Sequence, residues 1–187
     1  STPKPSSAAS DVYKRQVYTF VMDEEEHKNA DKTDTHFPGF IYDQPYQRGH
    51  VWGEERKKKL IFSLVTGIPV GAIVINDRFK NANKFIERGE QGWCSAVIDG
   101  KQRIHAILDF VNNKFSVPAA WFDTENLNVE NDVENVYFKD LTKGAQSSFK
   151  TGTSIPIAEA HVATIEEEKE IFDLINFGGV NQGDSDI

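Results

Sequence analysis

The sequence predicts an α+β fold in which a mixed sheet is flanked by helices. Two apolar runs of strand length, residues 70–75 and 93–98, lie in the first half of the chain, and the second runs into an amphipathic helix. Further strand and helix patterns follow, with an irregular stretch between them. Mixed strands and helices with an irregular middle are typical of an α+β domain.

The first half of the domain is predicted to contain a helix, a strand, a loop, a strand and a helix. Residues 54–66 place their apolar side chains on one helical face, and Gly67 supplies the stop. The apolar run 70–75 predicts a central strand, whereas the polar residues 76–91 predict a loop or ragged hairpin. A helix is expected over residues 101–112. Its inward-facing residues are Ile104, Ile107, Leu108 and Val111.

The second half has weaker signals. Its expected elements are a strand interrupted at Pro118 (116–122), a strand (136–138), a helix (141–149), a strand (154–162) and a helix (166–175). The apolar face expected for the last helix consists of Ile171, Leu174 and Ile175. The three glutamates 166–168 are expected to form a solvated face at its favourable N-terminal end.

The N-terminal region differs in composition from the rest. Residues 1–35 are mostly small or charged and are interpreted as a flexible leader, with a short strand at 17–21. The stretch through Gln16 is compatible with a non-native leader. The folded domain is expected to span residues 36–187.

Composition limits the functional classes. The net charge of −8 and the pI near 5.1 argue against nucleic-acid binding through bulk electrostatics. The basic run 56–59 is interpreted as the solvated face of a helix. No apolar run approaches the roughly 18 residues needed to cross a bilayer, so no membrane partner is expected. The single cysteine, Cys94, lies in an apolar strand; this fits a reducing, cytoplasmic setting and argues against a catalytic thiol.

The sequence DGKQR, residues 99–103, carries the main functional signal. It joins an apolar strand to an amphipathic helix, and a helix N-terminus attracts anions such as phosphate. Cations normally avoid this position, so Lys101 and Arg103 suggest a negatively charged ligand. The planar fork of Arg103 suits two-point contact with phosphate, with a structural salt bridge as the alternative.

The other residues of this turn have two interpretations each. Gly100 serves either a tight turn or the close approach of a phosphate. Asp99 is either an N-cap or a group that holds Mg²⁺ or positions a water for attack on phosphate. Gln102 either orients a water or lies on the surface. Upstream, Trp52 is expected to pack a loop against the core rather than to stack on a base.

The histidines give weaker signals. His50 is a weak candidate for a general base, and His105 is expected to be a surface or packing residue. No zinc or other metal site is predicted, because His27, His36 and His161 have no partners at metal-ligand spacing.

Three segments together resemble a known family. Residues 37–52, FPGFIYDQPYQRGHVW, resemble the opening motif of the GmrSD-type restriction endonuclease N-terminal domain, long called domain of unknown function 262. Residues 99–103 are similar to its DGQQR motif and depart from it only at Lys101. A later element of the family is matched by Phe172, Asn176, Gly178 and Gly179.

The resemblance implies a ParB/sulfiredoxin-like fold in which a strand–turn–helix holds nucleotide phosphates. The strand–turn–helix segment is also similar to a ParB sequence pattern, which Gly100, Arg103 and Ala106 match in this chain. A nucleoside triphosphate, with Mg²⁺, is the implied cofactor. The catalytic candidates are Asp99, Gln102 and Arg103. The cofactor-binding candidates are Gln47, Arg48, Gly100, Lys101, Asn176, Gly178 and Gly179.

The resemblance implies an NTP-hydrolysing domain of a DNA restriction or anti-phage system. Its further partners would be DNA and an HNH-type nuclease subunit that carries the cleavage chemistry. The alternative is a non-catalytic, ParB-like module for DNA interaction or regulation. The chain ends seven residues after Val180, which fits a C-terminally truncated fragment or a minimal stand-alone form.

Overall fold

The structure is a computed structural model. It describes residues 12–17, 19–22, 39–47, 52–129 and 132–177.

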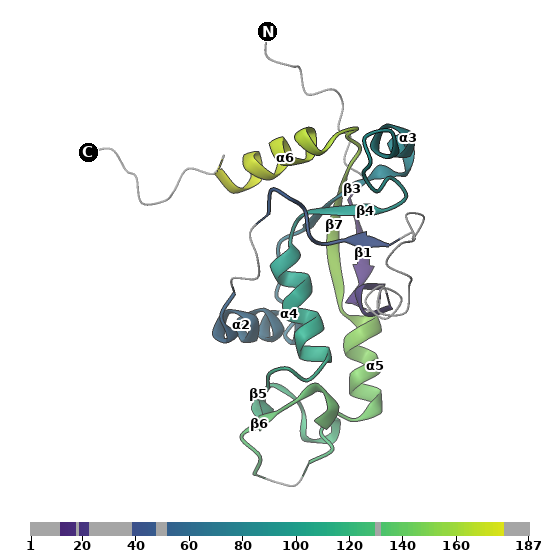
Figure 1. The fold of residues 1–187 in the computed structure, drawn as a ribbon. Coiled ribbons are helices and arrows are strands. Elements are labelled where there is room, and N and C mark those ends of the chain that lie inside the picture. Colours follow the sequence, from purple (N-terminus) through teal and green to yellow (C-terminus); the bar gives the residue numbers. More distant parts are fainter. Residues whose placement is uncertain (1–11, 18, 23–38, 48–51, 130–131, 178–187) are drawn as a thin grey trace, which may run out of the picture.

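A five-stranded mixed sheet organises this part of the chain (Figure 1). Its strands are β1 (Val12–Gln16), β2 (Phe40–Ile41), β3 (Ile73–Asp77), β4 (Ser95–Asp99) and β7 (Ser154–Ala160). They are arranged in the order β1-β7-β3-β4-β2. The pairs β7–β3 and β2–β4 are parallel, and the other two are antiparallel. A small second sheet pairs β5 (Val117–Pro118) with β6 (Asn135–Val136).

Helices flank the sheet. They are α2 (Glu54–Val65), α3 (Ala82–Ile86), α4 (Lys101–Val111), α5 (Lys143–Gly152) and α6 (Ile165–Phe177). In Figure 1, α2 and α4 lie side by side, and α5 runs directly into β7. This arrangement confirms the predicted α+β class with a mixed sheet and flanking helices. The finer ParB/sulfiredoxin-like assignment stays a prediction.

The C-terminal half of α4 is fixed by an aromatic cluster. The ring of Phe110 lies 5.8 Å from that of Phe115, 5.5 Å from that of Phe138 and 5.6 Å from that of Phe149. All four side chains are buried. Because aromatic pairs add attraction beyond their buried area, this cluster holds α4 rigidly and so fixes the position of its N-terminus.

The polar segment 76–91 is more ordered than the sequence indicates. After β3, a 3-10 helix (η1, Arg78–Asn81) leads directly into α3. The prediction of a loop or ragged hairpin is wrong here, because Phe85 is fully buried and anchors the segment to the core. The free energy gained by burying one large apolar side chain can hold a segment in an ordered structure even when the residues around it are polar.

Several shorter elements also differ in extent from the prediction. The strand expected at 116–122 is reduced to β5, because the chain turns into a 3-10 helix (η2, Ala119–Trp121) after Pro118. The helix expected at 141–149 starts later, since the Thr142 hydroxyl accepts a hydrogen bond from the Ala145 N–H and caps α5.

Part of the N-terminal region belongs to the domain. β1 pairs with β7 at the edge of the sheet, and Val17 and Phe20 are fully buried. The Phe20 ring lies 5.3 Å from that of Phe40. The expectation that residues 1–35 lie apart from the domain is therefore wrong for this stretch. The strand predicted at 17–21 is also wrong, because residues 17 and 19–22 are helical.

The inner face of α6 carries a buried charged residue. Glu168 is fully buried, whereas Leu174 and Ile175 are 71% and 43% exposed. The prediction that glutamates 166–168 form a solvated face is thus wrong for Glu168, and that of an apolar inner face is wrong for Leu174 and Ile175. The physical reason is an ion pair that periodicity does not reveal: Arg78 Nη2 lies 2.6 Å from Glu168 Oε2 beneath the helix.

Among the described helices, none combines the length and the apolar content that crossing a bilayer requires.

Candidate functional site

A cleft of about 670 Å³ lies at the N-terminus of α4. Its walls come from three regions that are far apart in the sequence: residues 46–47 with 52 and 56, residues 98–103, and residues 172–176. Every predicted site residue within the described part of the chain lines it. These residues are Gln47, Asp99, Gly100, Lys101, Gln102, Arg103 and Asn176. Three further predicted residues, Arg48, Gly178 and Gly179, lie outside the described residues, as do His27, His36 and His50.

Gly100 forms the corner between β4 and α4. Its φ of 101° is in the left-handed region that side chains disfavour. A Cβ at this position would lie 2.8 Å from Cγ1 and 3.2 Å from Cα of Ile73 on β3. The turn and the packing of the strand therefore account for the glycine without a ligand. Gly100 occupies the N-cap position and has no side chain, so no N-cap side chain satisfies the N–H groups of the first turn of α4.

Asp99 and Arg103 form an ion pair within the cleft. Arg103 Nη2 donates to Asp99 Oδ2 at 2.6 Å, and the two side chains are 16% and 24% exposed. Burial lowers the pKa of the guanidinium, an effect that the Asp99 carboxylate opposes. Of the two structural alternatives, the N-cap role of Asp99 is wrong because Gly100 holds that position. The salt bridge of Arg103 is present, but it lies in the cleft rather than away from it.

The guanidinium of Arg103 also lies against Gly71. A Cβ on Gly71 would come within 2.7 Å of Arg103 Nη1. The glycine therefore provides the space in which the guanidinium sits, between the start of β3 and the first turn of α4.

Lys101 also has a carboxylate partner. Its Nζ forms an ion pair with Asp43 Oδ1, and this hydrogen bond lowers the pKa of Asp43. In the sequence alone, Lys101 and Arg103 are cations that need a negative ligand. In the structure each has a carboxylate partner, so it is the cleft itself that indicates a ligand.

Gln47 is held rigidly by the β4 backbone. Its Nε2 donates to the carbonyl oxygens of Val97 at 2.6 Å and Ile98 at 2.7 Å. Its Oε1 is buried and has no hydrogen-bond partner within the described part of the chain. A buried acceptor without a donor costs free energy, so this oxygen is suited to accept a hydrogen bond from a bound molecule.

Aromatic groups and a further cation line the same cleft. The Arg56 guanidinium lies 4.4 Å from the centre of the Trp52 ring, and Trp52 also packs against the core, as the sequence predicts. The backbone N–H of Trp52 lies 3.4 Å from Gln102 Oε1, which ties this residue to α4. Arg56 is exposed. Sequence reasoning did not place it at the cleft, because it assigns residues 56–59 to a solvated helix face.

The wall opposite α4 comes from α6. The Phe172 ring packs 5.5 Å from that of Tyr46, and Asn176 Nδ2 donates to the Phe172 carbonyl at 2.8 Å. Tyr46 in turn donates to Glu168 Oε2 at 3.4 Å. Burial, with the nearby Glu168 charge, raises the pKa of Tyr46 far above its usual value. The segments that contain Tyr46 and Phe172 both resemble family motifs, and in the fold both lie at the same cleft as DGKQR.

A family model for the GmrSD restriction endonuclease, N-terminal domain, matches residues 27–187. The chain belongs to this family. It is therefore a domain of a GmrSD-type restriction system. The match covers all three segments that line the cleft. No curated protein and no solved structure matches the chain.

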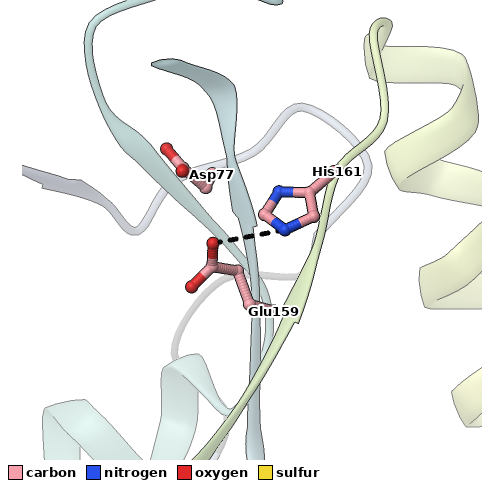
Figure 2. Close-up of side chains that lie close together, drawn as sticks. All are labelled: Asp77, Glu159 and His161. Atoms are coloured by element: carbon pink, nitrogen blue, oxygen red, sulfur yellow. Dashed lines mark ion pairs between the residues drawn. The ribbon is translucent and has the colours of Figure 1, made fainter. Parts of the chain in front are cut away.

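A second cluster of polar side chains lies elsewhere on the sheet (Figure 2). Asp77, Glu159 and His161 bring one ligand atom each to within 4.8 Å of one another. Sequence spacing assigns His161 no metal-ligand partner, whereas the fold brings Asp77 and Glu159 close to its ring. Asp77 is 84 positions away in the chain and is brought close by strand pairing, which spacing rules do not detect.

Proposed function

We propose that the cleft binds a nucleoside triphosphate with its phosphates at the N-terminus of α4, and that the domain hydrolyses it. The observation that carries this proposal is the convergence of three distant segments on one cleft at a helix N-terminus. A volume of about 670 Å³ is in the range of sites for small-molecule cofactors. The backbone N–H groups of the first turn add a positive potential at this end.

The charges at the cleft suit a polyanion. Arg56, Lys101 and Arg103 line it. The side chains of Lys101 and Arg103 are only 11% and 16% exposed, so their charges are weakly screened by water. Bound phosphate oxygens would share these cations with Asp43 and Asp99 through charge-assisted hydrogen bonds.

Asp99 gives a reason for Mg²⁺. A carboxylate next to a triphosphate repels it unless a cation lies between them. Mg²⁺ is commonly held by one or two carboxylates together with phosphate oxygens, so Asp99 is the residue that would hold it. Gln102 lies on the first turn of α4, lines the same cleft as Asp99, and would orient the attacking water.

Neutral parts of the nucleotide have partners as well. The free acceptor Gln47 Oε1 suits a hydroxyl or amino donor of the ligand. Trp52 and Phe172 offer apolar ring surface on either side of the cleft. The nucleotide would thus contact all three segments and stabilise their arrangement.

Binding is tested by calorimetry with ATP, GTP, CTP and UTP, each with and without Mg²⁺. Arg103→Lys keeps the charge next to Asp99 but loses the planar fork. Arg56→Ala removes an exposed cation. Loss of a hydrogen bond to a charged group costs about 1.5–3 kcal/mol, which raises Kd about 10- to 150-fold. Lys59→Ala is the matched control, because Lys59 is exposed on α2 and does not line the cleft. Absence of binding by every nucleotide contradicts the proposal, as does wild-type affinity in both cleft variants.

Turnover is tested separately by phosphate release. Asp99→Asn should abolish release while the nucleotide still binds. The ion pair with Arg103 favours a second candidate, a non-catalytic module, because it already neutralises the carboxylate that hydrolysis would use. Tight binding without phosphate release in the wild-type protein would support that candidate. In either case, DNA and an HNH-type nuclease subunit are the partners we propose for cleavage.

A further inference from the structure

The pairing of β3 with β7 gathers three potential metal ligands. The strands run parallel, with Ile75 opposite Glu159 and Asn76 opposite Ala160. Continuing this register places Asp77 opposite His161. Since side chains alternate between the faces of a strand, Asp77, Glu159 and His161 all project from the same face. Figure 2 shows both ring nitrogens of His161 on the side of the ring that faces the two carboxylates.

The three side chains are close and mostly shielded from solvent. One ligand atom from each lies within 4.8 Å of the other two. The side chains of Glu159 and His161 are 16% and 19% exposed. His161 Nε2 lies 3.5 Å from Glu159 Oε1, and Asp77 Oδ1 accepts a hydrogen bond from the Phe79 N–H at 3.1 Å. Two carboxylates held this close repel each other, so the cluster favours a cation at its centre.

His161 supplies an independent observation. Its Nδ1 is buried and has no hydrogen-bond partner within the described part of the chain. A buried ring nitrogen without a hydrogen-bond partner costs free energy, and coordination to a metal ion would satisfy it. Neutral imidazole is a common metal ligand, so the histidine favours a metal ion over a cation held by the two carboxylates alone.

We propose that Asp77, Glu159 and His161 bind a divalent transition-metal cation, with Zn²⁺ as the best match. One imidazole nitrogen and two carboxylate oxygens suit Zn²⁺, whereas Mg²⁺ and Ca²⁺ prefer oxygen ligands alone. Three protein ligands leave a further coordination position for water. The bound ion links the end of β3 to the end of β7 and so braces the parallel pair.

The site is separate from the nucleotide cleft. β3 and β4 are antiparallel, with Asp77 opposite Ser95 and Val74 opposite Asp99. The metal cluster therefore lies at the opposite end of this strand pair from the cleft. The proposal does not depend on nucleotide binding, and its test uses protein without nucleotide.

Lys80 is the natural competitor for the metal. Its Nζ lies 3.2 Å from His161 Nε2, the same ring nitrogen that lies 3.5 Å from Glu159 Oε1, so it occupies space beside a proposed ligand. Lys80 is exposed and sits on η1, so its long side chain can swing into solvent when an ion enters. Its removal should therefore strengthen metal binding.

The test is calorimetric titration of the untagged full chain with ZnCl₂, together with the thermal midpoint with and without metal. We expect one Zn²⁺ per chain and a higher Tm on binding. His161→Gln and Glu159→Gln should each weaken binding at least about tenfold, because each removes a direct ligand. Lys80→Met should bind at least as tightly as the wild type. Glu125→Gln, a change of the same type at an exposed position, should bind as the wild type does.

Several results overturn the proposal. Absence of Zn²⁺ binding by the wild-type protein overturns it. This includes the case in which only Lys80→Met binds Zn²⁺, because the Lys80 ammonium group then occupies the site in the wild type. Binding that persists in both His161→Gln and Glu159→Gln shows that the ion sits elsewhere. The metal-free Tm of each variant confirms that it is folded before binding is compared.

Discussion

The buried ion pair between Arg78 and Glu168 gives the sharpest stability prediction. Glu168→Gln removes the negative charge at nearly constant volume. In the wild type, Arg78 Nε donates to Glu168 Oε1 at 2.7 Å and Nη2 to Oε2 at 2.6 Å, with both side chains almost completely buried. Asn76 Nδ2 also donates to Oε1 at 2.8 Å. The carboxylate thus satisfies several donors that have no access to water.

The magnitude follows from the charge that is left behind. A buried ion pair adds little compared with an apolar substitute, but removal of one partner leaves the other charge desolvated and unpaired. That costs about 3–5 kcal/mol. Domains of this kind have total stabilities of about 5–15 kcal/mol, so the loss is a large share. Arg78 keeps only neutral acceptors, Gln44 Oε1 and the Gln91 carbonyl, each at 3.0 Å.

Urea denaturation measures the change in the free energy of unfolding. Glu166→Gln is the matched control, because Glu166 is exposed on the same helix and should change stability by less than about 0.5 kcal/mol. In the double variant Arg78→Met with Glu168→Gln, the loss should be smaller than the sum of the single losses by about 0.5–3 kcal/mol. The reasoning is refuted if Glu168→Gln costs no more than Glu166→Gln, or if the two losses simply add.

Three further predictions follow from the same geometry. Gly100→Ala should destabilise the fold by more than Gly89→Ala: both positions have positive φ, which costs about 1–2 kcal/mol, but only Gly100 also meets a neighbouring strand. Comparison of the two urea midpoints checks this, and equal losses would contradict it. Gly71→Ala should leave the free energy of unfolding almost unchanged, because the new Cβ meets only the flexible end of Arg103. It should nevertheless weaken nucleotide binding in calorimetry, and unchanged affinity would count against a phosphate role for Arg103. Burial raises the pKa of Cys94 to about 11, so at pH 8 nearly all of the thiol is protonated and should react with a disulfide reagent only after unfolding; fast reaction of the native protein would show that the side chain is accessible.

Local patterns in the sequence predicted the elements that position the cleft. α2 and α4 begin at the predicted residues, Glu54 and Lys101, because their apolar periodicity and end signals lie within the segments themselves. The strands β3 and β4 were also predicted, although they begin two to three residues later than the apolar runs do. The strand–turn–helix at DGKQR follows from the same local information.

Other features depended on pairing that no local pattern reports. The carboxylate partners of Lys101 and Arg103, the buried position of Glu168 and the cluster around His161 all result from side chains that meet across the fold or across a helical turn. Each involves charged residues, which sequence analysis assigns to the surface by default.

The sequence by itself determined the family, the α+β class and most of the residues that line the cleft, because these are carried by short motifs and by apolar periodicity. Only the tertiary structure decided which charges are already neutralised, that α6 packs through a glutamate, and that Asp77 meets Glu159 and His161. The physical reason is that burial and charge pairing depend on distances in space, and these distances are set by strand register rather than by separation along the chain.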